Sequence, residues 1–170
     1  MKISKERRLA VSTNPGILLL YGAPKVGKTS MLSELKDCLI VDTERGARMV
    51  DGTILEVTSR DGLVDVLKSL KGEKAPRFKY IAIDTIDKVA EWAERTVCTE
   101  ENVSSIADLA FGKGYGLVRE KVINTISAFN NICEHLIVVG HRKVAYAVTE
   151  GNQIVIPESL DLTGKLKNVV

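Results

Sequence analysis

Residues 22–30, GAPKVGKTS, bring two glycines, two lysines and two hydroxyl side chains into one short segment. Their spacing, G-x-x-x-x-G-K-T, is that of a Walker A loop, whose backbone N–H groups surround a phosphate. The amine of Lys28 is expected to reach the β- and γ-phosphate oxygens and to take part in catalysis, and the hydroxyl of Thr29 to ligate Mg²⁺. The segment therefore predicts a nucleotide-binding site formed by Gly22, Ala23, Pro24, Lys25, Val26, Gly27, Lys28, Thr29 and Ser30.

A second motif, YIAIDTID at residues 80–87, is an apolar run that ends in an aspartate. A strand-end aspartate beside a Walker A loop holds Mg²⁺ through water, so Thr29 and Asp84 are the predicted metal residues. The alternative is that Asp84 caps the following helix, although Asp87 is better placed for a cap. The sequence has no N-K-x-D segment for guanine, and Asp87 stands where a D-x-x-G switch has its glycine. ATP with Mg²⁺ is therefore favoured over GTP.

Hydrolysis also needs a carboxylate that orients the attacking water. In many AAA+ machines this glutamate directly follows the Walker B aspartate, but here Thr85 occupies that position. Residues 38–46, CLIVDTERG, instead supply Glu44 just beyond a predicted strand. This setting resembles the D-x-E arrangement of the RecA family, which implies that Glu44 is the catalytic base. The alternative is that Asp42 or Glu44 caps a turn or pairs with Arg45.

The segment HLIVVGHRK, residues 135–143, places a histidine at the end of another apolar run. In this fold class, the strand is expected between the Walker A and Walker B strands, so His141 should lie beside the γ-phosphate. The RecA family carries a polar sensor there, and an imidazole both donates and accepts hydrogen bonds. The alternative is a strand-end histidine in solvent, which is the expectation for His135 at the other end of the strand.

The elements that must position these residues follow from the hydrophobic pattern. Continuous apolar runs predict buried strands at residues 17–21, 38–41, 53–57, 80–83 and 136–139. Helical periodicity predicts helices at residues 29–36, 61–70, 86–99 and 116–134. This alternation predicts an α/β fold with a mostly parallel sheet flanked by helices. Alternating residues around the EGN turn at 150–152 predict a late β-hairpin within residues 142–157.

The 170 residues are expected to form a single domain, 1–170, that is complete or lacks only its C-terminal strand or tail. A net charge of +2 is compatible with nucleic acid but does not indicate it. No apolar run approaches the roughly 20 residues of a membrane span, so no membrane partner and a cytoplasmic location are expected. Three cysteines without a C-x-x-C pair predict neither a disulfide framework nor a zinc site.

Three further segments carry a resemblance to a family: FGKGYGLVRE at 111–120, VVGHRK at 138–143 and PESLDLTGKLKNVV at 157–170. Together they resemble phage-encoded RecA-like ATPases, the small single-strand annealing proteins of the Sak group. The resemblance implies a RecA-like P-loop core, ATP and single-stranded DNA binding, and annealing or strand exchange in phage recombination inside the host cell. Relatives usually continue beyond the length of this chain.

Two segments are expected to face DNA, one around residues 111–115 and one after His141. Their glycines would allow close backbone approach, their basic side chains would neutralise phosphates and their aromatic rings would stack on bases. Assembly into a homo-oligomeric ring or filament would multiply these weak contacts. The alternative is a solvated turn and a hairpin that packs on its own subunit, with Phe111 in the core. The predicted DNA-binding residues are Lys113, Tyr115, Arg142 and Lys143.

We therefore predict a RecA-like ATPase that acts on single-stranded DNA in recombination or annealing, with DNA-stimulated turnover. One alternative is a small-molecule P-loop phosphotransferase. Such an enzyme usually clamps the transferring phosphate with several arginines, whereas the late loop offers only Arg142. Another alternative is a nucleotide-gated interaction module that barely hydrolyses ATP.

Overall fold

The computed structural model describes residues 16–142, 148–150 and 153–155. Its centre is a five-stranded parallel sheet with the order β1-β5-β4-β2-β3. The strands are β1 (Ile17–Gly22), β2 (Cys38–Asp42), β3 (Thr53–Glu56), β4 (Tyr80–Asp84) and β5 (His135–His141). The predicted α/β fold is confirmed, and β5 does lie between the strands that carry the Walker A and Walker B motifs.

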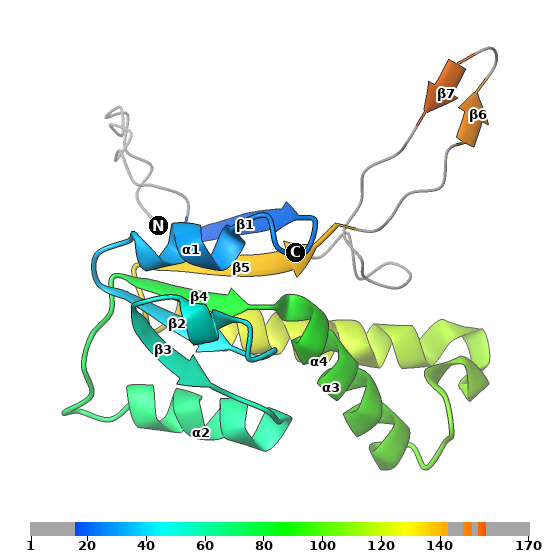
Figure 1. Cartoon of the computed structure of the whole chain (residues 1–170). Coiled ribbons are helices and arrows are strands. Elements are labelled where there is room, and N and C mark those ends of the chain that lie inside the picture. Colours follow the sequence, from blue (N-terminus) through cyan, green and yellow to red (C-terminus); the bar gives the residue numbers. More distant parts are fainter. Residues whose placement is uncertain (1–15, 143–147, 151–152, 156–170) are drawn as a thin grey trace, which may run out of the picture.

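Helices cover both faces of the sheet (Figure 1). One face packs on α1 (Lys28–Ser33), and Leu32 of this helix contacts Ile40 of β2 and Ile137 of β5 in a small core cluster. The other face carries the larger core, to which three helices contribute. They are α2 (Arg60–Leu70), α3 (Ile86–Glu100) and α4 (Lys113–Asn130). Successive residues of the central strands point to opposite faces, so one apolar run serves both cores.

The central strands β2, β4 and β5 are buried along their length, as their continuous apolar sequences predict. The edge strands differ from that prediction, because Leu18 of β1 is 50% exposed and Leu55 of β3 is 41% exposed. The late hairpin is confirmed as the antiparallel pair β6 (Val148–Glu150) and β7 (Gln153–Val155). Residues 156–170, which include the segment PESLDLTGKLKNVV, lie outside the described residues.

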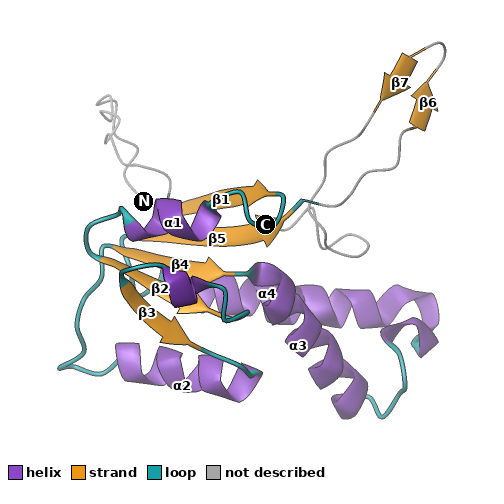
Figure 2. Cartoon of the chain, viewed as in Figure 1, coloured by secondary structure: helices purple, strands orange, loops and turns teal. Residues whose placement is uncertain are grey.

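Three short 3₁₀ helices complete the described fold (Figure 2): η1 (Ala47–Met49), η2 (Ile106–Asp108) and η3 (Ala110–Gly112). Helix α4 begins at Lys113, before its predicted start at residue 116, and η2 and η3 precede it. Gly112 precedes the helix at a left-handed φ of 72°, which a glycine adopts without strain. Gly114 is buried against η2, where a Cβ atom would lie 2.3 Å from the carbonyl oxygen of Ile106. Gly112 therefore permits the left-handed turn before α4, and Gly114 permits the close packing of α4 on η2.

Helix α1 is shorter than predicted and ends at Ser33. Phe111, for which a core position was the alternative, is fully exposed. Across the described part of the chain, no helix combines the length and apolar character that a membrane crossing requires.

Candidate nucleotide-binding site

The phosphate loop joins β1 to α1 along one wall of a cavity of about 430 Å³. Gly27, at a φ of 91°, and Lys25, at a φ of 63°, adopt left-handed conformations that turn the backbone around the loop. The cavity has the size of a small-molecule site. Its walls combine the phosphate loop with the ends of three strands, through Pro24, Lys25, Gly27, Lys28, Thr29, Ser30, Asp42, Glu44, Gly46, Val50, Asp84, Thr85 and His141.

Lys28 lines this cavity, whereas Gly22, Ala23 and Val26 of the predicted loop do not. The buried amine of Lys28 donates hydrogen bonds to the carbonyl oxygens of Gly22 at 3.1 Å and Ala23 at 2.9 Å. Val26 is 62% exposed and is absent from the cavity wall. The amine of Lys28 is therefore hydrogen-bonded to the backbone of its own loop. A phosphate would have to compete with these two carbonyl oxygens for it.

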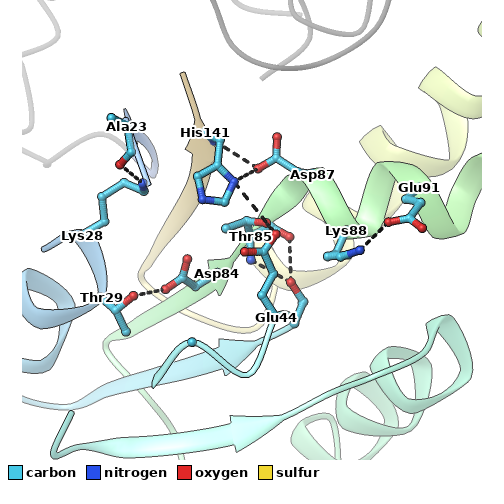
Figure 3. Close-up of polar contacts among 12 residues, drawn as sticks. Ala23, Lys28, Thr29, Glu44, Asp84, Thr85, Asp87, Lys88, Glu91 and His141 are labelled. Carbon is cyan, nitrogen blue, oxygen red and sulfur yellow. Dashed lines mark hydrogen bonds and ion pairs between the residues drawn. The ribbon is translucent and has the colours of Figure 1, made fainter. Parts of the chain in front are cut away.

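The predicted metal residues lie next to each other. The Thr29 hydroxyl donates a 2.6 Å hydrogen bond to Oδ2 of Asp84, which ends β4 (Figure 3). Burial raises the pKa of Asp84, and the bond from Thr29 partly opposes this effect. A hydroxyl and a carboxylate are the hard oxygen donors that Mg²⁺ prefers. In the described residues no group of three or more His, Cys, Asp or Glu side chains could hold a metal by itself. Mg²⁺ here would therefore also depend on nucleotide and water oxygens.

The loop after β2 separates the roles of its two acidic residues. Asp42 is buried and caps the turn, since its carboxylate accepts hydrogen bonds from the backbone N–H groups of Glu44, Gly46 and Ala47 at 2.9–3.1 Å. Arg45 pairs with Glu56, at 3.6 Å, instead of with Glu44. The Glu44 side chain is thus left on the cavity wall, where its Oε1 accepts a 2.9 Å hydrogen bond from the hydroxyl of Thr85.

His141 ends β5 and lies on the same cavity wall. Its ring atom Nδ1 is 3.3 Å from Oδ2 of Asp87 and 3.9 Å from Oε1 of Glu44 (Figure 3). Its backbone N–H also donates to Oδ2 of Asp87, at 3.1 Å. His135 lies at the opposite end of the strand and stacks on Tyr80, with ring centroids 5.2 Å apart. Of the two histidines, His141 alone lines the candidate site.

The prediction that Asp87 caps the helix after β4 is wrong. The N-cap of α3 is Thr85, which makes no side-chain capping bond, and Asp87 lies in the first turn. Burial raises the pKa of Asp87, against the opposing influence of His141. Sequence reasoning missed the contacts of Thr85 and Asp87 with Glu44 and His141. The available signal was the pair of polar residues, Thr85 and Asp87, that follows Asp84 in DTID.

The predicted DNA-binding residues do not come together in the described part of the chain. Lys113 and Tyr115 belong to the first turn of α4, at the end of this helix that points away from the phosphate loop (Figure 1). Lys113 forms an ion pair with Glu101 at 2.7 Å. Arg142 directly follows β5, and its backbone N–H donates to the carbonyl oxygen of Gly22 at 3.0 Å. Lys143 lies outside the described residues.

A larger cavity of about 570 Å³ borders Glu44 but lacks the phosphate loop. The basic side chains that line this cavity form ion pairs: Lys88 and Arg95 pair with Glu91, and Arg45 pairs with Glu56. The smaller cavity is therefore the candidate nucleotide site.

Comparisons with known proteins agree with this geometry. Residues 15–168 match the family model described as an AAA domain. Over 108 residues the chain is 30% identical to the SPbeta prophage-derived uncharacterized protein YorG of Bacillus subtilis (strain 168). The match covers 61% of this chain and 33% of YorG, so it spans about a third of that relative's length. With its Walker A loop beside a parallel sheet, the chain belongs to the AAA domain family of P-loop ATPases.

Proposed function

We propose that the chain is a Mg²⁺-dependent ATPase of RecA-like type, in which Glu44 orients the attacking water. The observation that carries this proposal is the meeting of Glu44 with Lys28 and the Thr29–Asp84 pair around one cavity. The hydroxyl of Thr85, in the place of the AAA+ glutamate, bonds to Glu44 and gives the carboxylate a defined direction.

Each residue has a distinct role in this proposal. The amine of Lys28 would leave the carbonyls of Gly22 and Ala23 and meet the phosphates. Thr29 and Asp84 would hold Mg²⁺, which neutralises charge on the phosphate oxygens when bound. Glu44 would accept a hydrogen bond from the water that attacks the γ-phosphate.

Glu44→Gln tests the proposed base by measuring phosphate release and the binding of a fluorescent ATP analogue. The amide keeps the shape of the carboxylate but cannot take a proton, so turnover should fall about 10²–10⁴-fold with analogue affinity unchanged. Glu56→Gln is the matched control, because Glu56 also ends a strand but pairs with Arg45 and Arg48 and does not line the nucleotide cavity. Parental turnover by Glu44→Gln would refute the role of Glu44.

We further propose that this ATPase acts on single-stranded DNA in recombination or annealing, as a ring or filament in the cytoplasm of a phage-infected or bacterial host cell. Support comes from the resemblance to the Sak group and from the link between Arg142 and Gly22, which joins the phosphate loop to the basic segment after β5. Nucleotide at the loop would thereby alter the position of Arg142. Lys113 and Tyr115 would make a separate contact, at the start of α4.

Fluorescence anisotropy with labelled oligo-dT at low salt tests DNA binding, with ATP, with ADP and without nucleotide. Binding should be tightest with ATP and should weaken as salt rises, because phosphate contacts release counterions. Arg142→Ala and Lys113→Ala should each weaken binding and lower its salt dependence, because each removes one cation that would neutralise a phosphate. If DNA binds in none of the three states and nucleosides raise turnover instead, the proposed role on DNA is refuted. The phosphate acceptor would then be a small molecule.

A further inference from the structure

Asp87 makes two polar contacts with His141. One of its oxygens, Oδ2, lies 3.1 Å from the backbone nitrogen and 3.3 Å from ring atom Nδ1 of this histidine (Figure 3). The other, Oδ1, is buried and has no hydrogen-bond partner among the described residues. The carboxylate does not cap α3, although its place in the first turn suits a negative charge. Its strongest geometric relation is therefore with the end of β5.

The 3.3 Å separation between Nδ1 of His141 and Oδ2 of Asp87 favours one tautomer of the imidazole. A carboxylate oxygen only accepts hydrogen bonds, so the hydrogen of the neutral ring must be on Nδ1 for the Asp87 contact to form. The other acidic group on that edge is Glu44, 3.9 Å from Nδ1, and its Oε1 already accepts the hydroxyl of Thr85. Nε2 lies on the opposite edge of the ring, and His141 lines the nucleotide cavity. A carboxylate that accepts a ring N–H commonly fixes both tautomer and orientation.

We propose that Asp87 is the positioning residue for His141. It holds Nδ1–H away from the nucleotide, presents Nε2 to the terminal phosphate and anchors the last residue of β5 through the backbone. This inference rests on the proposed function, since it assigns the cavity to ATP. Without the Asp87 carboxylate, Nδ1–H loses its acceptor and the ring is free to rotate, so Nε2 would no longer be held toward the terminal phosphate.

Nitrogen NMR of the imidazole rings tests the positioning directly. The chain has two histidines, so protein labelled with ¹⁵N-histidine gives two ring systems, which a His135→Gln variant assigns. At a pH where both rings are neutral, His141 should carry its hydrogen on Nδ1 in the parent. In Asp87→Ala it should shift to the Nε2–H form that the side chain of free histidine prefers. His135, stacked on Tyr80 at the other end of β5, is the internal control.

Asp87→Asn separates the hydrogen bond from the charge. Its amide oxygen can take the place of Oδ2, so the Nδ1–H form of His141 should be kept at least in part. Unchanged His135 signals would confirm that each variant is folded. A parent in which His141 carries its hydrogen on Nε2, or an Asp87→Ala variant with the parental tautomer, would overturn the inference.

Nucleotide binding provides the functional readout. Asp87→Ala should weaken a non-hydrolysable ATP analogue and lower turnover by about tenfold, the smaller end of the usual effect of lost supporting hydrogen bonds. The affinity for ADP should stay within about twofold, because ADP lacks the phosphate that Nε2 would meet. Equal losses for both nucleotides would indicate a structural role and overturn the inference. A parent that binds neither nucleotide would refute the proposed function, whereas the tautomer measurement would still decide the role of Asp87.

Discussion

Substitution of Gly114 by alanine tests whether packing, rather than DNA, explains the glycine-rich sequence FGKGYG at residues 111–116. An alanine Cβ at this position would lie 2.3 Å from the carbonyl oxygen of Ile106 and 2.8 Å from its Cβ. Real Cβ atoms essentially never approach other atoms this closely. The obstacle is backbone, and Ile106 is itself anchored in the core at 3% exposure, so α4 and η2 must separate to admit the methyl group.

The expected change in the free energy of unfolding for Gly114→Ala is the balance of two opposing effects. Alanine is favoured over glycine by up to about 1 kcal/mol within a helix. Overpacking of a well-packed site typically costs about 1–3 kcal/mol, and a clash with backbone belongs at the upper end. We therefore expect Gly114→Ala to lower the free energy of unfolding by about 2 kcal/mol. Gly116→Ala is the matched control two residues away, since a Cβ there meets nothing within 4 Å. It should raise stability by about 0.4–1 kcal/mol.

Urea unfolding followed by circular dichroism measures both variants. With a slope of about 2 kcal/mol per molar urea, the midpoint of Gly114→Ala should fall by about 1 M and that of Gly116→Ala should rise by a few tenths of a molar. The single tryptophan, Trp92 on α3, packs against the main core and gives a second probe of the same transition. Equal stability of Gly114→Ala and the parent, or equal losses in both variants, would refute the packing explanation and reopen a binding role for these glycines.

Two further substitutions probe the site. Thr85→Val removes the hydroxyl that bonds to Glu44, and a hydrogen bond to a charged group contributes about 1.5–3 kcal/mol, so steady-state turnover should fall at least tenfold with ADP affinity unchanged. Asp84→Asn should make the nucleotide-free protein more stable to heat at pH 7 in EDTA. Burial raises the pKa of Asp84 above 3.8, so its contribution to the free energy of unfolding falls as the pH rises through the interval between 3.8 and the raised pKa. The same variant should lose the stabilisation that Mg²⁺ and ATP confer, and a melting temperature below the parent's in EDTA would contradict this account of the carboxylate.

The order of the sheet and the cavity wall could be predicted because they depend on local signals. Three buried strands each end in a polar residue, at Asp42, Asp84 and His141, and parallel strands bring their carboxyl ends to one edge. The Walker A spacing identifies the edge, and the fold class places β5 beside β1. The prediction that Glu44 faces the cavity follows from the same logic, because it lies two residues beyond the end of β2.

The contacts between distant residues could not be predicted in this way. Asp87 and His141 are 54 residues apart, and their meeting depends on how the first turn of α3 faces the end of β5. Spacing alone indicated a cap for Asp87, which is the commoner use of such a residue. At the start of α4, glycines at 112, 114 and 116 lowered the helix propensity and indicated a loop. Tertiary packing of Gly114 on Ile106 overrides that propensity.

The two threonines beside Asp84 explain why the proposed base can come from a neighbouring strand. Thr43 donates its N–H to the carbonyl of Asp84 at 2.7 Å, and its hydroxyl both accepts from the N–H of Thr85 and donates to its carbonyl. Both threonines are buried, so the ends of β2 and β4 are held together and the Thr85 hydroxyl reaches Glu44. A glutamate in the place of Thr85 would set a second carboxylate against Glu44, and like charges in contact raise the pKa of one partner. With Thr85 in that position, no second carboxylate competes with Glu44, and the hydroxyl of Thr85 instead donates a hydrogen bond to the proposed base.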